Sequence, residues 1–149
     1  GKLPYLIYLI AHNIYKMKIP FIPRVITLFN RFLTGAYIPH TAIIGKGTKF
    51  SYGGAAVVIH ARAKIGNNCT IGPAVTLGRR KGNGVPSIGD NVFIGGGAKI
   101  LGGIRIGDNS VIGVNSIIIN DIPANSLVVA DISQVKRRNI SRSDIVEWT

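Results

Sequence analysis

The chain has 149 residues, of which 46% are hydrophobic and 16% are charged. This composition is typical of one globular domain with a core of its own and excludes a disordered chain. The charge is uneven, because residues 1–89 contain seven lysines, five arginines and no acidic residue, whereas residues 90–149 contain six basic and six acidic residues. The formal net charge of +12 therefore lies entirely in the first part, which favours an anionic partner.

The anionic partner of this basic part can be a nucleic acid, a membrane surface or a polyphosphate cofactor. We expect no nucleic acid, because no nucleic-acid-binding motif accompanies the charge and the aromatic residues are not interleaved with it. Instead of binding a membrane surface or a polyphosphate cofactor, the basic surface can also serve only to keep the protein soluble. The single cysteine, Cys69, excludes a disulfide within the chain, and we expect a cytoplasmic protein, with the inner membrane surface as a more specific location.

Residues 1–36 are predicted to form a helical segment. An apolar run from Leu3 to Ala11 is followed by basic residues and by Pro20 and Pro23, which predicts two short amphipathic helices broken near the prolines. The run is too short to span a bilayer, which needs about 20 apolar residues, and no signal-peptide cleavage site follows it. The helices can cap the open end of the next domain or pack on another subunit, or they can lie at a membrane interface. In the last case four cations would lie near lipid headgroups: Lys16, Lys18, Arg24 and Arg31.

A six-residue repeat defines a second domain over residues 37–130, which is followed by a C-terminal tail over residues 131–149. In residues 87–119 isoleucine recurs at every sixth position, and glycine usually follows it. A period of six fits neither an α-helix nor a continuous alternating strand, so the chain must turn at a fixed interval and stack its aliphatic side chains in register. The pattern predicts an all-β solenoid, a β-helix of hexapeptide repeats. The anchors are Ile44, Phe50, Ile59, Ile65, Ile71, Leu77, Ile88, Ile94, Ile100, Ile106, Ile112 and Ile118.

The repeat is interrupted twice. The step from Phe50 to Ile59 is nine residues, and the step from Leu77 to Ile88 is eleven. Extra residues must leave a solenoid as loops, and such loops commonly carry the binding face, so we expect function at these two places. The anchors make up four triangular coils of about 18 residues each, and the flat faces of such a prism favour a homotrimer with a ligand groove between subunits.

Four segments carry a resemblance to a known family: GGAAVVIHARAKIG, IGNNCTIGPAVTLG, SIGDNVFIGGGAKILGGIRIGDNSVIGVNSII and DIPANSLVVA. They resemble the left-handed β-helix acyltransferases, and within them the serine acetyltransferase-like branch. The resemblance implies a left-handed parallel β-helix and the transfer of an acetyl group from acetyl-CoA to a hydroxyl. In that family a histidine acts as general base and a carboxylate orients it.

The chain departs from this family at the expected catalytic residues. Serine acetyltransferases have an aspartate just before the first coil and a histidine fifteen residues later, where this chain has Tyr37 and Tyr52. A second family histidine, located before a proline in the second loop, corresponds to Val85. No acidic residue precedes Asp90, so a carboxylate partner would have to come from the second half of the chain or from another subunit.

His60 and Tyr52 are the remaining catalytic candidates. His60 follows the anchor Ile59, where it either acts as the general base or only satisfies the polar groups of a corner. Tyr52 carries a phenol that is protonated at neutral pH, so it is a better hydrogen-bond donor than a base. We expect His12 to be structural within its helix, and His40 to serve the backbone of a turn.

The resemblance also implies a groove for CoA. Small side chains would leave room for the pantetheine arm, and cations would bind the phosphates, although each basic run can equally be an ordinary solvated surface. The groove residues would be Gly97, Ala98, Lys99, Gly113, Val114 and Asn115, with Arg79, Arg80, Lys81, Lys136, Arg137 and Arg138 as the phosphate-binding candidates. We expect no metal site.

The sequence thus predicts an acetyl-CoA-dependent O-acetyltransferase whose acceptor hydroxyl belongs to serine or to a sugar of a cell-surface polysaccharide. The sugar is considered because the helical segment is far shorter than the helical domain of serine acetyltransferases, and because their catalytic pair is absent. The alternative is a catalytically lapsed hexapeptide-repeat protein that binds CoA or partners without turnover.

Overall fold

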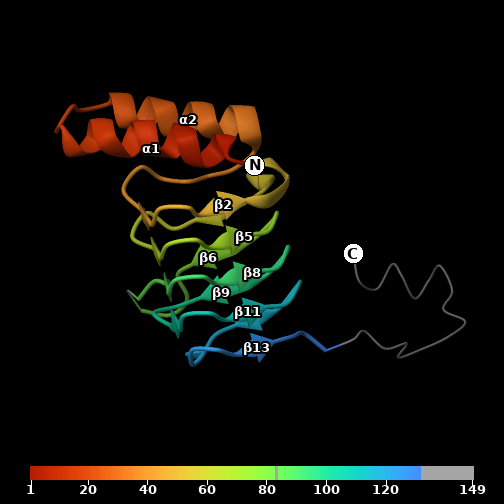
Figure 1. The fold of residues 1–149 in the computed structure, drawn as a ribbon. Coiled ribbons are helices and arrows are strands. Elements are labelled where there is room, and N and C mark those ends of the chain that lie inside the picture. Colours follow the sequence, from red (N-terminus) through yellow and green to blue (C-terminus); the bar gives the residue numbers. More distant parts are fainter. Residues whose placement is uncertain (83, 132–149) are drawn as a thin grey trace, which may run out of the picture.

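The computed structural model describes residues 1–82 and 84–131, which form two helices followed by a stack of short strands (Figure 1). Helix α1 (Leu3–Lys16) and helix α2 (Ile22–Thr34) are separated at Pro20, as the sequence predicts. Pro23 lies in the first turn of α2, where a missing N–H costs nothing because that turn has no helical acceptor. Helix α2 ends at Gly35, whose φ of 73° is readily adopted by glycine.

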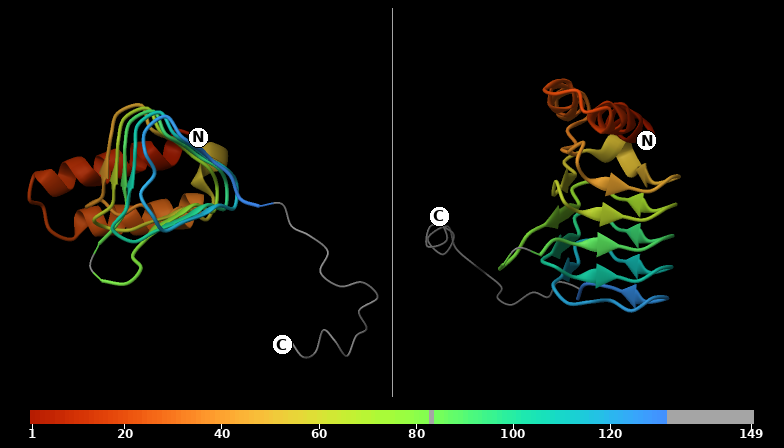
Figure 2. Two further views of the ribbon diagram at one scale, coloured as in Figure 1. Left: turned by 90° about the horizontal axis from the view of Figure 1, so that it is seen from below. Right: turned by 90° about the vertical axis from the view of Figure 1, so that its left-hand side faces the viewer.

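The strands form three parallel sheets, which are the faces of a triangular prism (Figure 2). Each coil visits the three sheets in turn, and neighbouring strands pair in register, so that Ile65 lies between Ile44 and Ile88. Sheet 1 contains β1 (Ile43–Ile44), β4 (Lys64–Ile65), β7 (Ser87–Ile88) and β10 (Arg105–Ile106). Sheet 2 contains β2 (Lys49–Phe50), β5 (Thr70–Ile71), β8 (Phe93–Ile94), β11 (Val111–Ile112) and β13 (Leu127–Val128). Sheet 3 contains β3 (Val58–Ile59), β6 (Thr76–Gly78), β9 (Lys99–Leu101) and β12 (Ile117–Ile118).

The predicted solenoid of four coils is confirmed, and β13 adds the beginning of a further turn. All twelve anchors point into the prism and are less than a tenth exposed. They form a continuous hydrophobic column, to which each fully buried aliphatic side chain contributes about 1.5 to 3 kcal/mol. The small residues between anchors, such as Val92 and Ala98, fill the remaining interior positions.

The two helices lie side by side over the first coil and cover that end of the column (Figures 1 and 2). The Tyr8 hydroxyl donates a hydrogen bond of 2.7 Å to the Ala42 carbonyl, and the Tyr5 hydroxyl donates one of 2.9 Å to the Gly45 carbonyl. Burial raises the pKa of Tyr8 to about 12, so its hydroxyl keeps the donated proton. The helices are therefore a cap, as one of the two interpretations predicts. Neither helix is long and apolar enough to cross a bilayer, and no other helix of the described residues is.

Two buried serines in equivalent interior positions differ in their hydrogen bonding. The Ser110 hydroxyl donates to the Pro123 carbonyl at 3.1 Å, whereas the Ser116 hydroxyl has no partner among the described residues. A buried hydroxyl without a partner costs free energy, so Ser116→Ala should raise the free energy of unfolding by about 1 kcal/mol. Ser110→Ala should instead lower it by about 1 to 2 kcal/mol. Urea denaturation of both variants tests this, and equal destabilisation by the two changes would contradict it.

Candidate functional site

The two interruptions of the repeat leave the prism at different corners. The first, at the corner between sheets 2 and 3 (the 2/3 edge), contains the 3₁₀ turn η1 (Ser51–Gly54) of the first coil. The second, residues 79–86, leaves the corner between sheets 3 and 1 (the 3/1 edge) after the second coil. Figure 2 shows the yellow turn and the green loop at separate corners. The predicted loops exist, but in one chain they do not border a common site.

The predicted site residues divide between the same two edges. Sheet 3 lies between the two groups, so one chain does not bring its candidate base His60 together with Tyr52. The 2/3 edge carries Tyr52, Gly97, Ala98, Lys99, Gly113, Val114 and Asn115, and the 3/1 edge carries His60, Arg79, Arg80 and Lys81.

Tyr52 projects from the 2/3 edge into solvent and is 86% exposed. Its φ of 49° lies in the left-handed region, which is unfavourable for a tyrosine, and Gly53 follows with a φ of 68°. Such strain persists only where the surroundings impose it, and it is common at functional positions. In this conformation the phenol hydroxyl is available to a second molecule.

Stacked turns of small residues form the 2/3 edge from the second to the fourth coil. Gly97 donates its N–H to the Pro73 carbonyl at 2.8 Å, and Asn115 donates its N–H to the Gly96 carbonyl at 2.9 Å. A Cβ on Gly97, whose φ is 75°, would meet the Asn115 side-chain oxygen, so a larger residue at position 97 would be strained and would displace that side chain. The result is an edge of partly exposed turns with few bulky side chains.

Two of the predicted groove residues have other roles than expected. Ala98 is fully buried in the column, so it does not reach a ligand at this edge. The Lys99 ammonium donates a 2.6 Å hydrogen bond to the Ala74 carbonyl and thereby ties the third coil to the second. Arg79, Arg80 and Lys81 are exposed, as phosphate-binding residues must be. Residues 136–138 lie outside the described part of the chain.

His60 stands at the start of the 3/1 edge and is partly buried. Its Nδ1 accepts the backbone N–H of Arg62 at 3.2 Å, so the proton of the neutral ring is on Nε2. In this orientation the His60 ring binds the backbone N–H of its corner through Nδ1 and can donate a hydrogen bond from Nε2–H, but Nε2 cannot accept a proton. Burial, and in second place the charges of Arg62 and Arg79, lower the pKa of His60. The ring is therefore neutral at pH 7.

His40 lies on the same 3/1 edge, one level closer to the helices. Its Nδ1 is 3.1 Å from the Thr27 hydroxyl, whose only proton is donated to the Pro23 carbonyl at 2.9 Å. Nδ1 of neutral His40 must therefore be the donor, which leaves the lone pair on Nε2. Burial, and then the charge of His12, lower the pKa of His40. The expected backbone role is thus replaced by a contact with α2, and His40 has the protonation state of a general base.

A pocket of about 340 Å³ lies between α2 and this edge. Arg24, Arg31, Tyr37 and His40 line it together with Ala61, the neighbour of His60. The Arg31 guanidinium lies over the Tyr37 ring, 5.7 Å from its centroid, in a cation–π contact. Because residues 1–82 contain no acidic side chain, the pocket is lined by cations and neutral groups only. It suits an acceptor with hydroxyl, carboxylate or phosphate groups better than one with an ammonium group.

Comparison with known proteins shows that part of the chain is similar to hexapeptide-repeat transferases. Residues 86–120 match the family model described as bacterial transferase hexapeptide, six repeats. The chain is 38% identical over 138 residues to a serine acetyltransferase of Synechococcus elongatus, a match that covers 91% of this chain and 56% of the relative.

Solved structures give the same result. A serine acetyltransferase isoform of Entamoeba histolytica in complex with cysteine has a TM-score of 0.80 and 33% identity, over 97% of this chain and 51% of the other. A serine acetyltransferase of Neisseria gonorrhoeae in complex with serine has a TM-score of 0.80 and 32% identity, over 89% and 55% of the two chains. The chain spans a little over half the length of these proteins. Together with the hexapeptide match, these similarities confirm the predicted resemblance: the chain is a left-handed parallel β-helix that resembles the acyltransferases of the serine acetyltransferase-like branch.

Proposed function

We propose that the chain is an O-acetyltransferase that moves an acetyl group from acetyl-CoA to a hydroxyl acceptor. The observation that carries the proposal is the similarity to serine acetyltransferases over nine tenths of this chain, which includes both edges of the prism. The 2/3 edge supports it chemically, because its partly exposed turns of small residues can lie against the pantetheine arm, which is long and thin. The proposed phosphate contacts are Arg79, Arg80 and Lys81, which are exposed cations.

We propose that a homotrimer brings the two edges together. In a threefold ring each contact joins two different surfaces, and in the proposed ring the 2/3 edge of one copy meets the 3/1 edge of the next. Sheet 3 lies between these edges, and its Val58 and Ile117 are 44% and 69% exposed, which supplies apolar area for an interface. The groove between copies would then contain the turns of Gly97 and Gly113 from one copy and the cationic loop from its neighbour.

The proposed reaction needs a base and a donor. A histidine takes the proton of the acceptor hydroxyl while the hydroxyl oxygen attacks the thioester carbonyl. CoA then leaves as the thiolate, and the histidine returns the proton to the thiolate sulfur. The oxyanion that forms needs donors, and the exposed Tyr52 hydroxyl of the adjacent copy is the proposed one.

We assign His60 as the base, because burial, and in second place the adjacent cations, lower the pKa of its ring and keep it neutral and ready to accept a proton. This role requires that the ring turns so that Nδ1 leaves the Arg62 N–H. His40 is the second candidate, favoured by its Nε2 lone pair and by its place in the pocket.

A sugar hydroxyl is the acceptor that we favour over free serine. The ammonium group of serine needs a carboxylate partner, and no acidic residue occurs before Asp90. Of the described acidic residues, Asp90 and Asp108 lie at the corner between sheets 1 and 2 and accept backbone N–H groups there. Asp121 lies on the 3/1 edge, but after the fourth coil, and accepts the Arg105 N–H at 2.8 Å. Serine remains the acceptor suggested by the Neisseria relative, whose structure contains it. A catalytically lapsed protein that only binds CoA is the competing proposal.

Thiol release from acetyl-CoA distinguishes these proposals. The protein should release CoA with an acceptor from a panel of neutral and acidic sugars, and more slowly with serine. His60→Ala should lower kcat about 10²- to 10⁴-fold if His60 is the base, and His40→Ala should do so if His40 is. Lys46→Ala, at the corner between sheets 1 and 2, is the control and should leave kcat unchanged. CoA binding without turnover on any acceptor would establish the lapsed protein instead.

The protonation of His60 provides a separate test. Its pKa should lie below the ordinary value of about 6.5. Arg79→Gln removes a nearby positive charge that disfavours the imidazolium, so the pKa should rise, whereas Lys46→Gln should not change it. The NMR signal of the His60 ring, followed against pH, measures both effects. If His60 is the base, the acid limb of kcat/KM should move to higher pH in the Arg79 variant. If the pKa of His60 is the same in the Arg79→Gln variant and in the unmodified protein, the described geometry is contradicted.

A further inference from the structure

The helical cap has an apolar outer side that no described residue covers. The inner sides of both helices are buried against each other and against the first coil. On the other side, large apolar residues recur at three- and four-residue spacing, which places them on one face of each helix. All of them are about half exposed or more, and Phe32 is 89% exposed. They are Leu3, Leu6 and Ile10 on α1, Met17 directly after it, and Ile22, Val25, Phe29 and Phe32 on α2.

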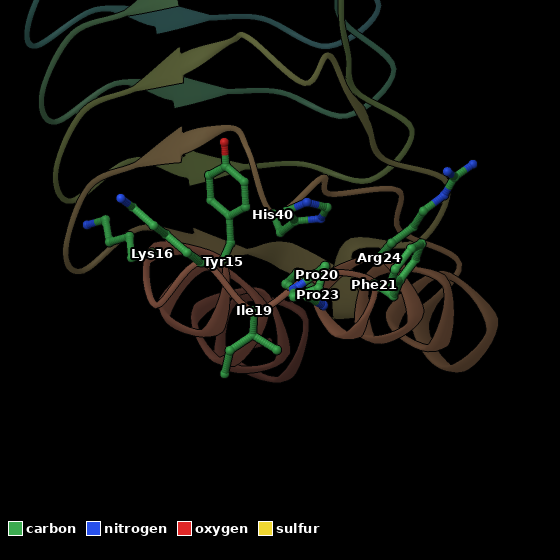
Figure 3. Close-up of a pocket in the computed structure, with 9 residues that line it drawn as sticks. Tyr15, Lys16, Ile19, Pro20, Phe21, Pro23, Arg24 and His40 are labelled. Carbon is green, nitrogen blue, oxygen red and sulfur yellow. The ribbon is translucent and has the colours of Figure 1, made fainter.

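Cations without any acidic residue accompany this apolar face. Residues 1–36 contain five basic residues and no Asp or Glu. Three of the cations, Lys16, Lys18 and Arg24, line an open pocket of about 750 Å³ where the chain passes from α1 to α2. Figure 3 shows this pocket between the linker and the first coil, with Tyr15 and His40 on the coil side. These cations supply positive charge that suits an anionic partner.

The charge decides between a membrane and a second copy as the occupant of this face. Two copies that met through their caps would bring two purely basic layers together, which costs electrostatic free energy. An anionic membrane offers negative headgroups to the cations and hydrocarbon to the apolar residues, which is how amphipathic helices bind at an interface.

We infer that the cap is a docking surface for an anionic phospholipid membrane. The apolar face of α1 and α2 enters the boundary between headgroups and acyl chains, and the basic side chains of residues 1–36 lie near the lipid phosphates around this face. The prism then stands away from the bilayer, with its 2/3 and 3/1 edges accessible. In the proposed homotrimer three parallel caps would bind the same membrane, which strengthens a contact that is weak for one cap.

Co-sedimentation with vesicles tests the inference. The protein should sediment at low salt with vesicles of phosphatidylcholine and phosphatidylglycerol, much less with phosphatidylcholine alone, and less at high salt. Lys16→Gln/Lys18→Gln should weaken binding to the anionic vesicles by about tenfold or more. Lys64→Gln/Arg105→Gln removes the same charge from exposed positions of sheet 1 and should have a much smaller effect. Circular dichroism should give the same spectrum for both variants.

Exchange of the apolar side chains separates the membrane from the other occupants. Val25→Ser/Phe32→Ser should abolish sedimentation with anionic vesicles and leave the oligomeric state in analytical ultracentrifugation unchanged. If this variant instead lowers the oligomeric state, a second copy covers the face and the inference is wrong. It is also wrong if the unmodified protein does not sediment with anionic vesicles at low salt, or if both charge variants weaken binding equally.

Discussion

The in-register hydrophobic column is the interaction on which the rest of the structure depends. No coil of about 18 residues can bury its anchors alone, so each must pack on the coils above and below it. Parallel pairing such as Ile44–Ile65–Ile88 fixes the height of every coil, and the anchors of the three sheets fix its width. Additional residues have no room inside, so all variation in the chain appears at the corners. The candidate site is a consequence of this constraint.

The same constraint explains the helical cap. The first coil lacks a preceding coil, so its carbonyl groups and its apolar interior would both face water. Side chains of α1 replace the missing coil: Tyr5, Tyr8 and His12 bind the carbonyls of Gly45, Ala42 and His40. These contacts require only one side of the helices. The apolar residues on the other side stabilise nothing in the described chain, which is why they point to a function outside the prism.

The sequence predicted the fold well, because a period of six with aliphatic anchors admits few arrangements. The sequence also implies that the candidate site is divided, because the first interruption of the repeat follows the second anchor, whereas the second interruption follows the sixth anchor. With three anchors to a coil, these places are different corners, so within one chain the two loops do not border one binding region. The contact of His40 with Thr27 could not be predicted, because it depends on how α2 packs on the first coil. The Arg62 N–H contact of His60 matches the alternative in which this histidine satisfies a corner.

The replacement of the family's catalytic pair changes the sign of the charge around the acceptor. Where the resemblance implies an aspartate, Tyr37 lies beneath the guanidinium of Arg31. A carboxylate would stabilise an imidazolium and strengthen the base, whereas the cations near His60 weaken it and keep it unprotonated to lower pH. The acceptor proton is transferred less completely to a weaker base in the transition state. A positive field, however, stabilises the oxyanion that forms. On the proposed assignment, the chain therefore relies more on oxyanion stabilisation than on base strength. In the proposed function the same field would attract CoA phosphates and acidic sugars and repel an ammonium group, which relates the missing aspartate to the proposed choice of acceptor.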